Sequence, residues 1–262
     1  TGSASLRSSV CFPSLFFGVS LILGIYHLSY EFTQKVMPSI LSLVLFFFLG
    51  GFGWTQLFTT KMFTDPNYLK YVDFIFEWPE HRNEYWFQPI TQVLLPQRAS
   101  LFSMPLCYWT ILMLVIGVKK EKVRYFFCAA IYTGLMPLVQ VHSYVAIAQW
   151  AIVYCFLTFP YKNRKQWKKF IMFWLVYGIV ANLFSFPQLI PYISRVKEAK
   201  DHFIRIQPIF NNKNPFTMWW YGLGPFSAIA CVFGWIALQK RQLVLYIPSF
   251  VVFLTTNIIR YQ

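Results

Sequence analysis

Residues 99–118 read ASLFSMPLCYWTILMLVIGV, a run without a charged side chain, and Lys119-Lys120-Glu121-Lys122 follow directly. A helix rises about 1.5 Å per residue, so a run of this length crosses the roughly 30 Å hydrocarbon core of a bilayer. The abrupt change from apolar residues to clustered cations is typical of a helix that leaves a membrane at its headgroups. The stretch therefore predicts a membrane-spanning helix.

The rest of the chain has the same character. Of its 262 residues, 57% are hydrophobic, 21% are aromatic and only 12% are charged, whereas soluble domains carry about 25% charged residues. A soluble fold of this length would need far more charge on its surface. We therefore expect an integral membrane protein.

Similar apolar runs elsewhere predict an all-α fold, a polytopic transmembrane bundle of about eight spans that forms one domain over residues 1–262. Helices are favoured because a backbone in lipid must satisfy its own hydrogen bonds, and no alternation of period two indicates a membrane β-barrel. Two short spans have only His142-Ser143 between them, and they predict either a tight helical hairpin or a pair of partly re-entrant helices. The spans are expected at 11–30, 36–58, 99–118, 125–141, 144–161, 170–193, 217–238 and 243–259.

The distribution of cations predicts the orientation. Alternating the spans places four short connections on one face, with only Glu31 and Glu121 as acidic residues there. An excess of Lys and Arg in short loops marks the cytoplasmic side. The long loops 59–98 and 194–216 are then expected to face outward or into a lumen. The basic residues of the four connections are Lys35, Lys119, Lys120, Lys122, Arg124, Lys162, Arg164, Lys165, Lys168, Lys169, Lys240 and Arg241.

The net charge of +14 does not indicate nucleic-acid binding, because the cations concentrate at the expected membrane edges. The basic stretch 162–169 is better interpreted as a topology signal that lies against anionic headgroups. The five cysteines have no metal-type spacing, and we expect them to be buried free thiols.

The outward loop 59–98 is the first candidate for chemistry. A loop of this length is usually functional or disordered, and its Tyr and Trp residues argue against disorder. Residues 67–77 have helical spacing and predict a short amphipathic helix on the membrane surface. Asp73 and Glu77 are four residues apart on it and share a face, so they could bind a metal or act as acid and base. The alternative is a solvated polar face.

Two further candidates lie on the same side. Arg98 follows Pro96-Gln97 at the expected start of a span, where a cation is unfavourable unless an anion lies nearby. A bound phosphate or an acidic side chain would supply that anion; the alternative is an Arg that extends to the headgroups. His142 is either a proton-transfer group or ligand, or a helix cap. Within the spans, Asn182 and Gln188 are expected to form hydrogen bonds between helices.

The order of several motifs resembles that in a broad family of polytopic proteins related to the GT-C membrane glycosyltransferases. The resemblance covers roughly residues 50–262, and it implies that this chain lacks an N-terminal part with the usual catalytic carboxylate and a C-terminal continuation. The motifs are Leu94-Leu95-Pro96-Gln97-Arg98, Pro137 with His142-Ser143, Phe186-Pro187-Gln188, Asn214 through Trp219 with Gly222-Leu223-Gly224, and the Pro248, Phe253 and Asn257 pattern.

The resemblance implies transfer of a sugar from a polyprenyl-phosphate donor at the outward or lumenal face, in the plasma membrane or the endoplasmic reticulum. Membrane lipids are the expected partners, nucleic acid is not, and a divalent metal ion is left open as a cofactor. A transporter and a non-catalytic assembly subunit are the alternative functions. The candidate residues are Asp73, Glu77 and His142 for catalysis and Gln97, Arg98, Arg195 and Arg205 for contacts with the substrate.

Overall fold

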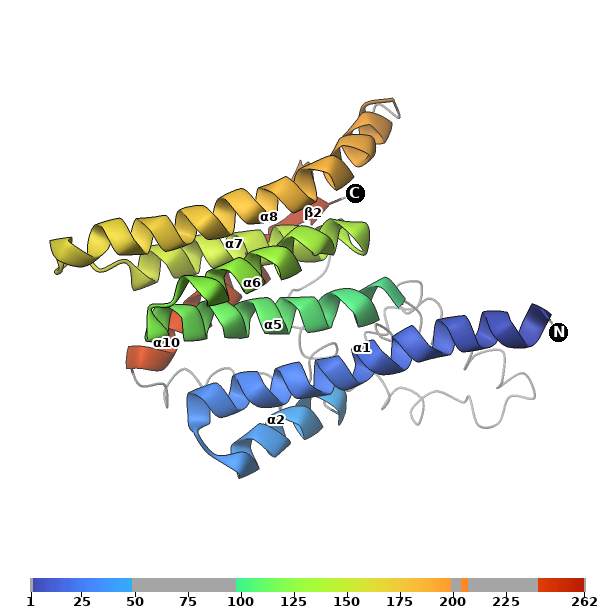
Figure 1. Cartoon of the computed structure of the whole chain (residues 1–262), viewed down its shortest axis with the longest axis horizontal. Coiled ribbons are helices and arrows are strands. Elements are labelled where there is room, and N and C mark those ends of the chain that lie inside the picture. Colours follow the sequence, from blue (N-terminus) through green and yellow to red (C-terminus); the bar gives the residue numbers. More distant parts are fainter. Residues whose placement is uncertain (1, 49–97, 199–203, 207–239, 262) are drawn as a thin grey trace, which may run out of the picture. The chain divides into compact units, whose positions relative to one another are not determined.

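The computed structural model describes residues 2–48, 98–198, 204–206 and 240–261. The chain divides into two units. Unit 1 comprises Thr1–Ser39, Ala99–Ile209 and Gln239–Gln262, and unit 2 comprises Ile40–Arg98 and Phe210–Leu238. The described part of unit 2 is residues 40–48 and Arg98, so most described elements belong to unit 1 (Figure 1).

Nearly all of the described chain is helical, as the apolar runs predict. The one departure is a short antiparallel pair of strands, β1 and β2, in which Arg205 lies opposite Arg260. The elements are α1 (Gly2–Thr33), α2 (Val36–Phe48), α5 (Arg98–Lys120), α6 (Val123–Leu135), the 3-10 helix η4 (Met136–Leu138), α7 (Val141–Thr158), α8 (Arg164–Glu198), β1 (Ile204–Ile206), α10 (Lys240–Ile258) and β2 (Ile259–Tyr261).

Four of these helices are long and apolar enough to cross a membrane, which agrees with a membrane protein. Three shorter apolar helices coincide with further expected spans. The expected span 217–238 and the expected surface helix 67–77 lie outside the described residues, so the count of about eight stays a prediction. The four long stretches are Pro13–Thr33, Ala99–Lys120, Val141–Thr158 and Arg164–Pro191, and the shorter ones are Val36–Phe48, Val123–Leu138 and Leu243–Thr255.

The core of unit 1 forms where α6 packs along α8 and α7 packs along α10. A side chain at Gly134 on α6 would have its Cβ 2.5 Å from the Phe184 Cβ and 2.9 Å from the Ala181 carbonyl oxygen, both on α8. A glycine is therefore needed here for the two backbones to approach this closely. Between α7 and α10, the Trp150 indole donates a hydrogen bond of 3.1 Å to the Ser249 hydroxyl.

The outer faces of the helices are apolar as well. Leu15, Phe156 and Leu183 are 67%, 65% and 68% exposed, and many other large hydrophobic side chains are more than a third exposed. A soluble protein rarely exposes so much apolar surface, whereas lipid solvates it without penalty. The exposure of these side chains agrees with the membrane assignment made from composition.

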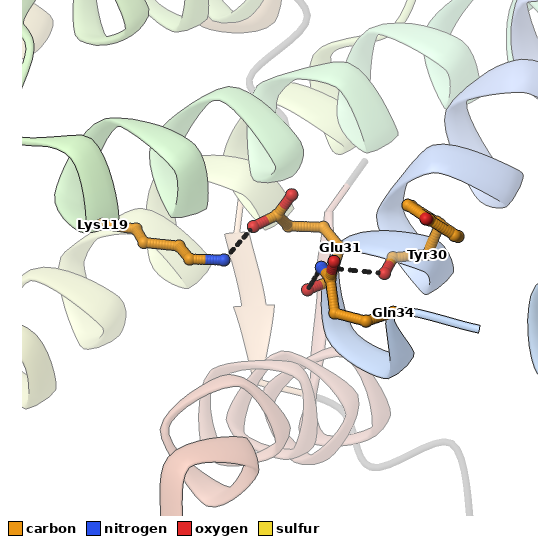
Figure 2. Close-up of polar contacts among 4 residues, drawn as sticks. All are labelled: Tyr30, Glu31, Gln34 and Lys119. Atoms are coloured by element: carbon orange, nitrogen blue, oxygen red, sulfur yellow. Dashed lines mark hydrogen bonds and ion pairs between the residues drawn. The ribbon is translucent and has the colours of Figure 1, made fainter.

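Three of the expected basic connections lie together at one end of unit 1. The Lys119 ammonium is 2.7 Å from the Glu31 carboxylate, and Figure 2 shows this pair joining the end of α5 to the end of α1. A second pair, Lys169 with Glu121, joins the start of α8 to the α5–α6 turn. Figure 1 also places the start of α10 at this end. We call it the basic end: the C-terminal ends of α1, α5 and α7 and the starts of α6, α8 and α10.

The end of α1 is closed by Gln34, whose backbone is left-handed with a φ of 52°. Its backbone N–H donates to the Tyr30 carbonyl at 2.8 Å, and its side-chain amide donates to the carbonyls of Tyr30 and Glu31 at 3.2 and 2.9 Å (Figure 2). These bonds satisfy carbonyl groups that the last turn of a helix leaves without partners. They hold Glu31 where Lys119 reaches it.

The α6–α7 connection differs from the expected one. Pro137 lies in η4, and Gln140 is extended with φ −158° and ψ 109° just before α7 begins at Val141. His142 and Ser143 are therefore in the first turn of α7 rather than between the helices. Because α6 packs mainly on α8 and α7 mainly on α10, the two consecutive helices do not form a closely packed hairpin.

Candidate functional site

The end of unit 1 opposite the basic end is formed by the first turns of α5, the α6–α7 connection and the later part of α8 (Figure 1). This is the end where the sequence predicts chemistry. Asp73, Glu77 and Gln97 lie outside the described residues. Arg98 is the first residue of α5, Arg195 lies in the last turns of α8, and Arg205 is the central residue of β1.

A cluster of three neutral side chains joins α5 to the α6–α7 connection. The Ser103 hydroxyl donates to the Gln140 side-chain carbonyl at 2.7 Å. The Ser143 hydroxyl lies 3.0 Å from both that carbonyl oxygen and the Ser103 oxygen. Ser103 is completely buried. We call Ser103, Gln140 and Ser143 the hydroxyl cluster, and the end that contains it the hydroxyl end.

The Gln140 side-chain oxygen is the acceptor that the cluster shares. The Gln140 oxygen has two lone pairs, and the two serine hydroxyls supply two protons. A primary amide is not a base, so neither hydroxyl is activated as a nucleophile in this arrangement. The cluster therefore positions the surrounding elements, and any reacting group at this end comes from other residues.

His142 is adjacent to the cluster. It is exposed at the second position of α7, directly before Ser143. Arg98 begins the helix that carries Ser103, five residues earlier, which is about 7–8 Å along the helix axis. The predicted candidates Arg98 and His142 are thus attached to two elements that the Ser103–Ser143 hydrogen bond of 3.0 Å joins.

A second set of polar contacts brings α8 to the same connection. The Ser185 hydroxyl is 3.2 Å from the Tyr144 hydroxyl. The Gln188 amide donates to the Gly134 carbonyl at 3.0 Å and to the Phe184 carbonyl at 2.6 Å. Gln188 thus makes the interhelical bond expected of it. Its side-chain oxygen is buried without a hydrogen-bond partner.

The contact of Gln188 lies where α8 changes direction. Pro187 and Pro191 are both inside this helix, and Figure 1 shows α8 bending toward its C-terminal end. Proline removes a backbone donor and clashes with the carbonyl four residues earlier, so a bend is expected here. The bend, the Gly134 contact and the α6–α7 connection meet at the hydroxyl end.

The roles of Ser103, of Gln140 as a hydrogen-bond acceptor and of Ser185 were not predicted from the sequence. Single serines in an apolar run carry no signal by themselves, because the partner of each lies about 40 residues away. Asn182 also departs from the expectation, since its amide donates to the Gly178 carbonyl of its own helix at 2.7 Å. Among the described residues, no group of three or more His, Cys, Asp or Glu side chains could hold a metal ion.

Comparison of the chain with protein-family models, with curated proteins and with solved structures finds no match.

Proposed function

We propose that the chain is a multi-pass membrane protein with its basic end at the cytoplasmic surface, and that its hydroxyl end binds the phosphate of a lipid-linked sugar donor as part of a GT-C-like glycosyltransferase. The observation that carries the proposal is the Ser103–Ser143 hydrogen bond of 3.0 Å. It joins the helix that Arg98 begins to the helix that carries His142, at the end remote from the cationic turns.

Charge supports this placement of the phosphate. The first turn of a helix presents unpaired N–H groups and the positive end of its dipole, both of which favour an anion. An Arg at that position adds a planar fork of donors that matches a phosphate. The spans carry no Asp, Glu, Lys or Arg over 99–118, 125–141, 144–161 or 170–193, whereas a transporter would be expected to hold ionisable groups near mid-membrane.

The reaction proposed is a single displacement. An acceptor hydroxyl attacks the anomeric carbon of the sugar and gives its proton to a carboxylate, for which Asp73 and Glu77 of this chain are the candidates. The bond from that carbon to the donor phosphate oxygen breaks, and the polyprenyl phosphate leaves. Arg98, with Gln97, Arg195 or Arg205, would stabilise the charge on the departing phosphate, and His142 would assist proton transfer.

The test is Arg98→Lys in the full-length protein, assayed for sugar transfer from a polyprenyl-phosphate donor in membranes. We expect a loss of about 100-fold or more in turnover, because an ammonium cannot reproduce a two-point phosphate contact. Arg124→Lys, an exposed position at the basic end, is the matched control and should retain activity. Unchanged turnover in Arg98→Lys, at normal expression, would refute the role of Arg98.

A further inference from the structure

One face of α8 carries a groove. It is a shallow, open depression with a volume of about 630 Å³. The lining positions repeat at intervals of four, so they follow one side of the helix. The lining residues are Trp174, Leu175, Gly178, Ile179, Asn182, Leu183, Phe186 and Pro187.

Gly178 forms the deepest part of this face. A Cβ added there would meet no atom within 4 Å, so the glycine leaves a notch in the helix surface. Leu175 and Ile179 beside it are 56% and 58% exposed. The indole nitrogen of Trp174 is shielded from solvent and has no hydrogen-bond partner. The groove is therefore mainly apolar, since Asn182 is the one polar side chain among its lining residues.

The same face of α8 carries cations one to three turns before the groove. Arg164 and Lys168 precede Leu175 by eleven and seven residues, spacings that return to the same side of a helix. Both side chains are exposed. The two ion pairs of the described residues use Lys119 with Glu31 and Lys169 with Glu121, and neither pair involves Arg164 or Lys168.

We propose that this face of α8 binds one anionic phospholipid, with its phosphate at Arg164 and Lys168 and an acyl chain in the groove over Gly178. Trp174 lies about 9 Å beyond Lys168 along the helix and Pro187 about 28 Å beyond it. The groove therefore begins at the depth where acyl chains begin below a headgroup and continues past the middle of the roughly 30 Å hydrocarbon core. One amphipathic molecule would place its anionic headgroup at the two cations and its acyl chain in the groove.

A second copy of the chain fits this face less well. Two copies related by a two-fold axis along the membrane normal would pack α8 against α8 in parallel. That arrangement would bring the Arg164 and Lys168 side chains of both copies together, and like charges at close range oppose association. An anionic lipid headgroup would instead be attracted to Arg164 and Lys168.

Native mass spectrometry of the purified full chain in detergent tests the proposal. The probes are dioleoylphosphatidylglycerol, which is anionic, and dioleoylphosphatidylcholine, which is zwitterionic. We expect the protein to retain one phosphatidylglycerol with at least about tenfold higher affinity than phosphatidylcholine, as one charge-assisted contact would supply. Equal retention of the two lipids would overturn the headgroup assignment.

Two pairs of variants distinguish binding of the lipid headgroup from binding of its acyl chain. Arg164→Gln with Lys168→Gln should abolish the preference for phosphatidylglycerol, whereas Lys122→Gln with Arg124→Gln, the same loss of charge on exposed residues outside α8, should retain it. Gly178→Leu should weaken binding of both lipids about tenfold. Gly18→Leu is its control, because a Cβ there also meets nothing within 4 Å.

The outcomes that contradict the proposal are distinct. If Lys122→Gln with Arg124→Gln lowers the preference as much as the α8 pair, the cations act as a diffuse charge and no site exists on α8. If Gly178→Leu leaves lipid binding unchanged but converts a dimer into a monomer in the mass spectrum, the groove holds a second copy of the chain instead.

Discussion

The two ends of unit 1 are held together by different chemistry. At the basic end, the ion pair Lys119–Glu31 joins the end of α5 to the end of α1, and the exposed pair Lys169–Glu121 joins the start of α8 to the α5–α6 turn. At the hydroxyl end, the neutral cluster of Ser103, Gln140 and Ser143 joins α5 to the α6–α7 connection with distances of 2.7–3.0 Å. Charges are tolerated where headgroups and water solvate them, and neutral hydrogen bonds are used where solvation is poorer.

This difference explains what each end can do. Ion pairs in a polar environment contribute little to stability, so the cations of the basic end remain available to set the orientation and to bind anionic lipid. The hydroxyl end is fixed by partly buried, geometrically specific contacts, which hold the elements in place around the proposed site. The basic end is thus expected to set the orientation of the protein, and the hydroxyl end to set the geometry of the proposed site.

The largest effect expected from this comparison is on the labelling of single cysteines, where each position should either react or fail to react from outside. In a background in which the five cysteines are replaced, His142→Cys should react with an impermeant maleimide added from outside. Lys165→Cys should react only after permeabilisation, because we propose that the basic end is cytoplasmic. Glu80→Cys, in the long loop, is expected to behave like His142→Cys. The reverse pattern would invert the orientation.

A difference of about 2 kcal/mol in the cost of substitution is expected between two glycines. A Cβ at Gly134 meets the Ala181 carbonyl at 2.9 Å and the Phe184 Cβ at 2.5 Å, whereas one at Gly117 first meets the Phe126 ring at 2.9 Å. A ring can move, but a helix backbone cannot move without displacing the helix. Gly134→Ala should cost about 3 kcal/mol and Gly117→Ala about 1 kcal/mol.

Unfolding of the purified chain in detergent measures both values. Gly178→Ala is the control, since its added Cβ meets nothing within 4 Å and alanine favours a helix by about 1 kcal/mol over glycine. If all three variants unfold alike, the close approach of α6 and α8 is incorrect.

A smaller loss is expected from the hydroxyl cluster. Gln140→Leu removes the acceptor that Ser103 and Ser143 share. The Ser103 hydroxyl keeps its contacts with the Ser143 hydroxyl and the Ser100 carbonyl, so the expected cost is the loss of the shared acceptor, about 1 kcal/mol. Gln166→Leu, an exposed position at the basic end, should change the unfolding free energy by less than about 0.5 kcal/mol. Equal effects would mean that the two ends do not differ in the way described.

The smallest effect is expected from the ion pairs. Glu31→Gln and Glu121→Gln should each lower the unfolding free energy by less than about 1 kcal/mol. Their effect should vanish in about 1 M salt, where the screening length falls to about 3 Å. Unfolding measured at low and high salt checks this. A loss that persists at high salt would indicate that these pairs are shielded from solvent.

The helices were predictable because lipid demands long uncharged runs. The 99–118 span corresponds to α5 (Arg98–Lys120), whose end the cations mark. The prediction for α8 was less accurate: it begins at Arg164, six residues before the expected span at 170–193. The turn Arg164–Lys169 is helical but polar, so hydropathy does not reveal it.

The candidate site was predictable only in part. The position of Arg98 at a helix start follows from the local signal of Pro96. His142 was predicted between two helices and instead lies in the first turn of α7. The hydroxyl cluster was missed because Ser103 and Ser143 are forty residues apart and their meeting depends on how α5 and α7 pack. Local patterns do not contain that information, and the roles of Asp73 and Glu77 stay predictions.

The length of α6 has a consequence for the membrane itself. Together α6 and η4 run from Val123 to Leu138, about 24–26 Å of helix, which is some 5 Å less than an average hydrocarbon core. With Val123 anchored by the basic turn, Leu138 stops short of the opposite surface, while α8 continues to Glu198. If α6 crosses the membrane as proposed, we expect the bilayer to thin or to admit water beside this connection. An incoming headgroup would reach the hydroxyl end by descending only part of the way into the membrane.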